Sequence, residues 1–276
     1  MISRAYIMEW HSMAPWPSSD QVEQDLVLSR ALVEMFEHPI VAEQAIFRGG
    51  TALHKLCLGS AGWYSEDIDL VQREARPIGD MVNAIRASLD PWLGKPKWKA
   101  GQGRFTLYYR FETTFHPVST RRLKIEINTR EHFAVLGTMS KRFAVTSRWF
   151  SGSAEVPVYR LDELLGTKMR ALYQRKKGRD LYDLWLALGT GLSDPEVTVK
   201  CFQEYMEHEG ATVSRAEFEA NLSAKLASEA FVDDIRLLIP ANIEYYPKVA
   251  AAVVMKELVA RLPGEPWKGS GLHTGQ

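Results

Sequence analysis

The pair Asp67 and Asp69 carries the clearest chemical signal in the sequence. Both lie in the segment 67–71, Asp-Ile-Asp-Leu-Val, whose alternation of polar and apolar residues is typical of a half-buried strand. Alternate side chains of a strand leave the same face, so the two carboxylates would repel each other unless a cation lies between them. Mg²⁺ or Mn²⁺ suits this arrangement, because such ions prefer carboxylate, water and phosphate oxygens. A polar edge strand with two solvated aspartates is the alternative.

Glu126 is a third candidate acid, on a second predicted strand. In the segment 124–128, Lys-Ile-Glu-Ile-Asn, the polar residues share one face and the isoleucines share the other. If this strand lies beside the strand of Asp67, Glu126 completes a cluster of three carboxylates that could hold two metal ions. Two metal ions activate an attacking hydroxyl and stabilise a leaving pyrophosphate. A cross-strand ion pair between Glu126 and a nearby arginine is the alternative.

A glycine turn precedes these acids. Gly49, Gly50 and Thr51 lie between a short apolar stretch at residues 40–48 and a helix predicted over residues 51–58. Glycines let the backbone approach a phosphate closely, and the N-terminus of a helix offers free N–H donors. We interpret the turn as a candidate phosphate site; an ordinary connection is the alternative.

A basic stretch lies further along the chain. Residues 168–180 hold six basic side chains and one acidic side chain, a local balance of +5, and include Lys168, Arg175 and Arg179. Residues 203–234 hold eight acids and two bases, so the net charge of zero hides a polarised chain. The basic stretch could bind a triphosphate, an RNA backbone or both, or be a solvated helix face.

The elements that must position these residues predict two domains. We expect a core over residues 1–158 with an N-terminal helical arm, a helical domain over 159–262 that contributes Lys168 and Asp180, and a flexible tail over 263–276. Within the arm, prolines predict that residues 1–19 are extended, and Asp20 with Glu23 predicts the capping box of the first helix.

The composition is that of a globular protein, with 46% apolar and 25% charged residues. No apolar run is long enough to cross a bilayer, and the N-terminus has no apolar core typical of a secretory signal. Two cysteines exclude a disulfide scaffold. We therefore expect a cytoplasmic protein that does not associate with a membrane.

The order of the motifs resembles a known superfamily. A Gly-Gly turn, a helix, an Asp-x-Asp strand and a lone acid on a later strand form the pattern of nucleotidyltransferases related to DNA polymerase β. More specifically, five segments resemble the AbiEii/AbiGii family of bacterial nucleotidyltransferase toxins, to which the mycobacterial MenT toxins also belong. These segments, spread over about residues 20–190, are FRGGTAL (47–53), SEDIDL (65–70), KIEIN (124–128), LLGTK (164–168) and GRDLYDL (178–184).

The resemblance implies an α+β fold, in which a polymerase β-like nucleotidyltransferase core with a mixed sheet is followed by a mainly helical C-terminal domain. It also implies the toxin of a toxin–antitoxin system, some members of which act in abortive infection. Characterised relatives transfer nucleotides from NTP to RNA, including the 3′ end of tRNA, and so block translation. A cognate antitoxin encoded nearby is the implied partner.

The resemblance also assigns roles to single residues. Ser65 and Asp67 match the first motif of the family, and Lys168 matches a lysine that contacts the triphosphate. The catalytic set is then Asp67, Asp69, Glu126, Lys168 and Asp180, with Asp67, Asp69 and Glu126 holding the metal. The nucleotide-binding set is Gly49, Gly50, Thr51, Ser65, Lys168, Arg175, Arg179 and Asp183.

Two assignments depart from the family pattern or stay open. Glu126 stands where polymerase β-like enzymes often carry aspartate, which leaves open whether it binds metal or acts as a base. Either Asp180 or Asp183 is the essential late acid, with Asp180 preferred. A Mg²⁺-dependent ribonuclease and a non-catalytic module that binds nucleotide or RNA are the alternative functions, because clustered acids also serve these.

Overall fold

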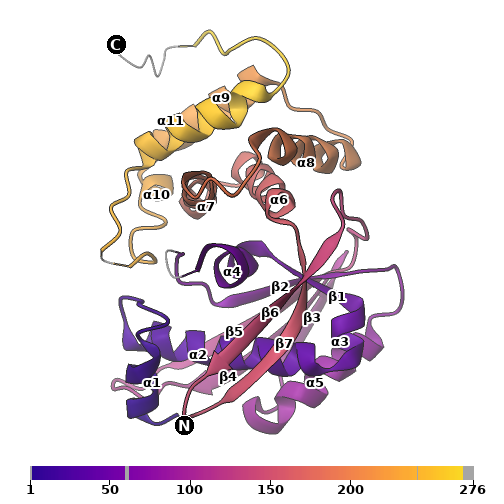
Figure 1. Ribbon diagram of the computed structural model, residues 1–276, viewed down its shortest axis with the longest axis vertical. Helices are drawn as coiled ribbons and strands as arrows, with labels where there is room; N and C mark the ends of the chain where they lie inside the picture. The colour runs from indigo at the N-terminus through magenta and orange to yellow at the C-terminus, as the bar shows by residue number, and fades with distance from the viewer. Residues whose placement is uncertain (1, 60–61, 241, 270–276) are drawn as a thin grey trace. The chain divides into compact units, whose positions relative to one another are not determined.

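The computed structural model describes residues 2–59, 62–240 and 242–269 (Figure 1). Contacts divide the chain into two compact units. The sheet unit comprises residues 1–160 and 238–242, and the helical unit comprises residues 161–237 and 243–276. The short return of the chain to the sheet unit is held by a hydrogen bond from the N–H of Tyr64 to the carbonyl oxygen of Leu238 (2.7 Å).

In the described part of the sheet unit, seven strands form one mixed sheet in the order β3-β4-β5-β2-β1-β7-β6. They are β1 (Ala45–Arg48), β2 (Asp67–Gln72), β3 (Lys97–Gly101), β4 (Arg104–Glu112), β5 (Thr120–Asn128), β6 (Thr138–Thr146) and β7 (Ser151–Tyr159). The pairs β2–β5 and β1–β7 are parallel, and the other neighbours are antiparallel. The predicted α+β class with a mixed sheet is therefore confirmed.

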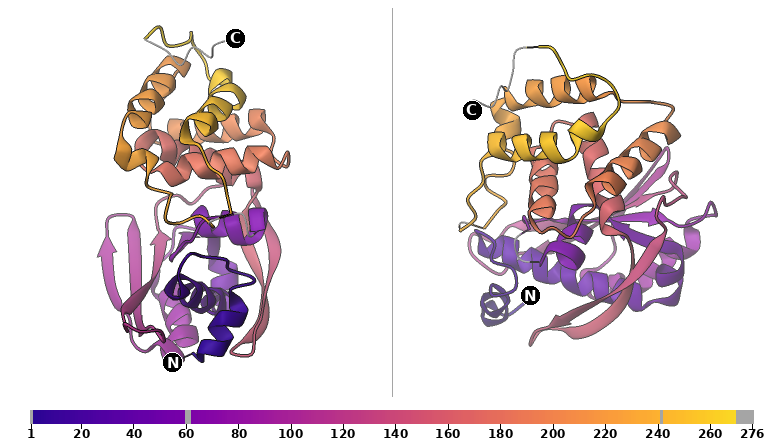
Figure 2. Two further views of the ribbon diagram at one scale, coloured as in Figure 1. Left: turned by 90° about the vertical axis from the view of Figure 1, so that its left-hand side faces the viewer. Right: turned by 45° about the horizontal axis from the view of Figure 1, so that its top comes forward.

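The helical segments of the sheet unit contact the sheet or α2. They are α1 (Arg4–Trp10), α2 (Ser19–Glu37), α3 (Pro39–Gln44), α4 (Gly49–Leu53), the π-helix η1 (His54–Leu58) and α5 (Gly79–Leu93). The long helix α2 contacts β2, β5, β6 and β7, and Figure 2 shows it within the curve of the twisted sheet. Ile68 and Ile125 are fully buried, as the alternation in their strands predicts. The polar residues of β2 and β5 consequently share the opposite face.

The start of the chain differs from the prediction in two ways. Residues 1–19 are not extended throughout, because α1 forms there and buries Ile7 and Trp10, one helical turn apart on its inner face. The capping box of α2 is built by Ser18 and Gln21 rather than by Asp20 and Glu23: the N–H of Gln21 donates to Ser18 Oγ, and the N–H of Ser18 donates to Gln21 Oε1.

The helical unit is built from α6 (Leu161–Gln174), α7 (Gly178–Gly189), α8 (Pro195–His208), α9 (Arg215–Leu226), α10 (Glu229–Val232), α11 (Pro247–Glu257) and the 3-10 turn η3 (Val259–Arg261). Helix α6 packs against α7 and α8. At Gly166 of α6, a β-carbon would lie 2.6 Å from Cβ of Cys201 in α8. The glycine of the segment 164–168 therefore permits this close helix packing.

The start of the predicted tail contacts the helical unit. The N–H of Arg215 donates to Pro263 O (2.8 Å), and the N–H of Trp267 donates to Glu219 Oε2 (2.7 Å). The rest of this predicted tail, residues 270–276, lies outside the described residues. Across residues 2–59, 62–240 and 242–269, no helix combines the length and apolar character needed to span a membrane.

Candidate active site

The parallel pairing of β2 and β5 brings the predicted acids to one face of the sheet. Asp69 lies opposite Glu126 in the strand register, and Asp67 lies opposite Lys124. Because side chains alternate along a strand, all four side chains leave the same face. Neither strand segment could specify this register alone, since the strands are separated by about fifty residues of chain.

Lys124 lies among these carboxylates. Its Nζ is 2.9 Å from Oδ2 of Asp67 and 3.4 Å from Oε2 of Glu126. Burial disfavours the charge on Lys124, but the interactions with Asp67 and Glu126 outweigh it and raise the pKa of the lysine. The ammonium group therefore neutralises part of the negative charge in the cluster.

Asp69 is the acid most affected by its surroundings. Burial raises the pKa of Asp69, and the adjacent charge of Asp67 raises it further. Arg48, its register partner on β1, and Lys124 partly offset this rise. A further positive charge beside Asp69 would relieve the same repulsion.

The donor set suits a hard divalent cation. In the described ranges, no group of three or more His, Cys, Asp or Glu side chains is arranged to hold a metal ion. Lys124 explains in part why the carboxylates are not arranged around an ion, because its positively charged Nζ lies between Asp67 and Glu126. Carboxylate oxygens are ligands for Mg²⁺ or Mn²⁺, so the residues fit such an ion if Lys124 swings aside.

The glycine turn is packed directly against the acids. Gly49 has a φ of +81°, a conformation that favours glycine, and a β-carbon at this position would lie 2.4 Å from Oδ2 of Asp69. Two constraints on Gly49 thus fix the start of α4 beside Asp69.

Thr51 and Ser65 connect the turn to the strand of the acids. Thr51 Oγ1 donates to the carbonyl oxygen of Asp67 (2.6 Å), and the hydroxyls of Thr51 and Ser65 are 2.6 Å apart. A threonine hydroxyl has one proton, so Ser65 is the donor in the second bond. Ser65 must release Thr51 before it can donate to a phosphate oxygen.

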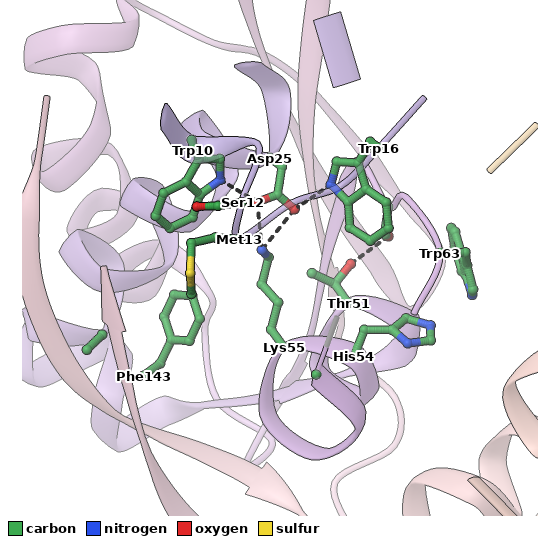
Figure 3. Close-up of a pocket in the computed structure, with 13 residues that line it drawn as sticks. Trp10, Ser12, Met13, Trp16, Asp25, Thr51, His54, Lys55, Trp63 and Phe143 are labelled. Atoms are coloured by element: carbon green, nitrogen blue, oxygen red, sulfur yellow. Dashed lines mark hydrogen bonds and ion pairs between the residues drawn. The ribbon is translucent and has the colours of Figure 1, made fainter. Parts of the chain in front are cut away.

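A hollow of about 330 Å³ adjoins this hydroxyl pair (Figure 3). We call it the tryptophan pocket. Its lining includes Trp10, Trp16, Trp63, Phe143, His54, Lys55, Asp25, Thr51 and Ser65. The side chains come from the end of α1 with the segment that follows it, from α2, from α4 and η1, from the loop before β2 and from β6.

Asp25 organises one side of the tryptophan pocket. Its carboxylate accepts hydrogen bonds from Nε1 of Trp10 (2.9 Å) and Nε1 of Trp16 (3.1 Å), and Figure 3 shows the two indoles on either side of it. Lys55 Nζ lies 3.1 and 3.0 Å from the two oxygens and donates to Ser29 as well (3.0 Å). The polar groups on this side are thus bound to one another.

In the helical unit, Lys168 is buried between two acids. Its Nζ is 2.6 Å from Oδ2 of Asp183 and 3.3 Å from Oδ1 of Asp180, and both acids are fully buried. Burial disfavours the charge on Lys168, but Asp183 and Asp180 raise the pKa of the lysine overall. Arg175 forms a bidentate pair with Asp180, both bonds 2.7 Å long, and half of its side chain is exposed.

The other basic residue predicted to bind nucleotide, Arg179, is half-buried, and its N–H donates to Asp234 (3.4 Å). Sequence reasoning missed Lys124 and the tryptophan pocket. Lys124 could have been found, since it belongs to the same alternating segment as Glu126. The assignment of all these residues to a reaction stays a prediction.

The sheet and its acid-bearing strands define a nucleotidyltransferase-like fold. The nucleotidyltransferase toxin MenT4 from Mycobacterium tuberculosis H37Rv superposes with a TM-score of 0.63 at 18% identity, covering 95% of this chain and 91% of the toxin. JHP933 from Helicobacter pylori superposes with a TM-score of 0.53 at 16% identity, covering 88% of this chain and 92% of that protein. These likenesses establish the fold.

The sequence itself establishes the family. Residues 30–253 match the family described as nucleotidyl transferase AbiEii toxin of type IV toxin–antitoxin systems. The chain belongs to this family, and it is a nucleotidyltransferase of the toxin class, as the motifs predicted. No curated protein sequence gives a significant match.

Proposed function

We propose that this protein transfers nucleotides from an NTP to the 3′ end of an RNA, with tRNA as the acceptor that the family resemblance implies, and so blocks translation in the cytoplasm. The acceptor 3′-oxygen attacks the α-phosphorus of the NTP. A bond forms between these two atoms, the bond from the α-phosphorus to the bridging oxygen breaks, pyrophosphate leaves, and the proton of the 3′-hydroxyl passes to Glu126 or to solvent. The observation that carries the proposal is the register that places Asp67, Asp69 and Glu126 on one face of β2 and β5.

We assign a role to each residue of the proposed site. Asp67 and Asp69 hold Mg²⁺, and Glu126 holds a second ion or orients the acceptor hydroxyl. Bound ions would lower the pKa of the attacking hydroxyl and offset the charge of the leaving pyrophosphate. The turn at Gly49 and Gly50 accommodates phosphate oxygens. Ser65 adds a hydroxyl donor once its bond to Thr51 opens, and Thr51 holds Ser65 in place beside β2.

The basic side chains of the proposed nucleotide-binding set lie in the helical unit. Lys168 is buried with Asp180 and Asp183, whereas Arg175 is half exposed. We assign phosphate binding to Arg175, with Arg179 and Lys168 completing the basic set. Asp180 holds the Arg175 guanidinium with two hydrogen bonds, which supports its choice over Asp183 as the late acid.

A nucleic-acid acceptor is supported by basic side chains on the open face of the sheet. Arg110 of β4 lies opposite Arg122 of β5, and both are exposed. Like charges directly opposite each other destabilise a sheet, so an anion between them is favourable. On β3, the exposed Lys97 and Lys99 extend the same face, because their register partners on β4 alternate in step with Arg110.

A hollow connects this basic face to the acids. Its volume is about 470 Å³, and its lining comprises Glu66, Asp67, Arg110, Thr120, Arg121 and Arg122. An RNA strand whose phosphates contact Arg110 and Arg122 can therefore place its 3′ end near Asp67. Family membership also implies an antitoxin partner. We propose that a neighbouring gene encodes it.

The test is incubation of the protein with total tRNA and each α-labelled NTP in turn, with Mg²⁺ or with EDTA. We expect labelled, lengthened tRNA that depends on Mg²⁺ and is lost in Asp67→Asn. Glu112→Gln, an acid at the far end of β4, is the control and should retain activity. Shortened RNA would indicate a ribonuclease, and NTP binding without product would indicate a binding module.

A further inference from the structure

We propose that the tryptophan pocket binds a nucleobase by stacking, beside the phosphate site; the inference rests on the nucleotidyl transfer proposed above. The base belongs either to the incoming NTP or to the 3′ end of the acceptor. The two sources share one chemistry, a flat heterocycle linked through ribose to phosphate.

The tryptophan pocket lies beside the hydroxyl groups of Thr51 and Ser65. Thr51 and Ser65 line the pocket, and Thr51 Oγ1 also donates to the carbonyl oxygen of Asp67. The pocket therefore adjoins the two hydroxyl groups of the proposed phosphate site and the backbone of β2 at Asp67. A nucleotide carries its base and its phosphates on the same ribose, so sites for the two must adjoin.

The walls of the tryptophan pocket are largely aromatic. Trp16, Trp63 and Phe143 present aromatic surface, and the ring of His54 packs edge-on against Trp63 with centroids 5.6 Å apart. Stacking of a base on aromatic side chains is worth about 1–3 kcal/mol per base. The volume of about 330 Å³ lies at the lower end of the range for small-molecule sites, about 300–1,000 Å³.

The polar side chains around Asp25, on one wall of the pocket, are hydrogen-bonded to one another. The carboxylate of Asp25 accepts from Trp10, Trp16 and Lys55, and Lys55 makes its three bonds within the same cluster. Because these groups bond to one another, the pocket is suited to recognise a base by its shape and by the area of its stacking surface. We therefore expect purines to bind several-fold more tightly than pyrimidines, with little distinction between adenine and guanine.

A π-helix builds part of the pocket. His54 and Lys55 are the first two residues of the π-helix η1, which follows α4 without interruption. Segments of π-helix are rare in proteins, and those that occur are often found at functional sites. Protein interiors are close-packed, so a hollow of this size among largely buried aromatic side chains differs from an ordinary core.

The test fills the pocket from its rim. Ser12, in the segment after α1, is exposed and lines the pocket, so Ser12→Phe should occupy it without removing a core side chain. Ser140→Phe, at an exposed serine of β6 outside the lining, is the control. Phe143→Ala removes one stacking surface and serves as a second variant. Thermal unfolding checks the fold of each variant.

The first arm measures binding of ATP, GTP, CTP, UTP and inorganic tripolyphosphate with Mg²⁺ and no RNA, so that no transfer is needed. If the base is that of the NTP, Ser12→Phe should weaken ATP binding at least tenfold. Ser140→Phe should change it less than twofold, and tripolyphosphate should bind all variants equally.

The second arm measures binding of a short RNA with an intact or an abasic 3′-terminal nucleotide. If the base is that of the acceptor, only the intact RNA should lose affinity in Ser12→Phe. Unchanged binding of both ATP and intact RNA in Ser12→Phe and Phe143→Ala would overturn the proposal. Absence of transfer by the wild-type protein, with base-dependent binding intact, would instead refute the proposed reaction and leave the pocket assignment standing.

Discussion

Gly49 and Asp69 are in contact so close that no side chain fits between them. A β-carbon on Gly49 would lie 2.4 Å from Oδ2 of Asp69, and the φ of +81° at Gly49 adds a second constraint. The glycine of the turn therefore fixes the position of a carboxylate proposed to bind metal. This proximity explains why a turn and a strand about twenty residues apart in sequence act together.

Substitution of Gly49 should therefore reduce transfer more than it reduces stability. We expect Gly49→Ala to lower the transfer rate about 100-fold, because a displacement of about 1 Å in a reacting group has an effect of this size. Gly137→Ala is the matched control: Gly137 also has a positive φ, +73°, but its β-carbon would meet nothing within 4 Å. Equal loss of activity in both variants would show that backbone strain, and not the proximity of Asp69, matters.

Lys124 should compete with the metal ion for Asp67 and Glu126. Its Nζ lies within 2.9 and 3.4 Å of the two carboxylates, so a bound ion must displace it. A partly exposed ion pair is worth up to about 1 kcal/mol, so Lys124→Met should tighten Mn²⁺ binding by about fivefold. Titration followed by electron paramagnetic resonance measures this, with Lys99→Met as the control. Weaker Mn²⁺ binding in Lys124→Met would mean that Lys124 assists the ion.

Removal of Lys168 should destabilise the helical unit. Deletion of one partner of a buried ion pair lowers the free energy of unfolding by about 3–5 kcal/mol, because the charge of the other partner stays in the protein interior without compensation. In Lys168→Met, Asp180 keeps its bidentate partner Arg175, whereas the 2.6 Å ion pair of Asp183 is removed. We therefore expect Asp183→Asn, added to Lys168→Met, to recover part of the stability in urea unfolding. Asp180→Asn added to the same variant should recover less, and the reverse order would contradict this interpretation of the ion-pair network.

The basic face should determine how salt affects RNA binding. Removing one side chain that binds a phosphate lowers the slope of log affinity against log salt by about 0.7 for a single strand. We expect Arg110→Ser and Arg122→Ser each to weaken binding of RNA of any sequence and to reduce this slope. Arg142→Ser, an exposed arginine on β6, should leave both quantities unchanged. Identical salt slopes for all three variants would place the RNA elsewhere.

The acids were predictable from sequence because strand alternation is a local property. The segments of Asp67 and Glu126 each show which side chains share a face, and the family resemblance supplied the order of the motifs. Lys124 follows from the same alternation. The register that places Asp69 opposite Glu126 depends on the pairing of distant strands, which no single segment encodes.

Other parts of the molecule lack a local pattern. The alternation Lys-Trp-Lys-Ala in β3 covers only four residues, and every residue of the strand is exposed, so it forms by pairing with β4 through a hairpin at Gly103. Helix α1 is short, and only Ile7 and Trp10 are buried in it. The tryptophan pocket gathers residues from five separate segments, and Asp25 joins two of its tryptophans through side-chain bonds that only the folded chain creates.

The acids of β2 and β5 should hold divalent ions together with the nucleotide. The most direct measurement is the number of Mn²⁺ ions bound per chain in the presence of an NTP analogue whose α–β bridge cannot be cleaved, followed by electron paramagnetic resonance. We expect about two ions in the wild-type protein and in Glu112→Gln, about one in Glu126→Gln, and none bound tightly in Asp69→Asn. The same number of ions in Asp69→Asn as in the wild type would contradict the claim.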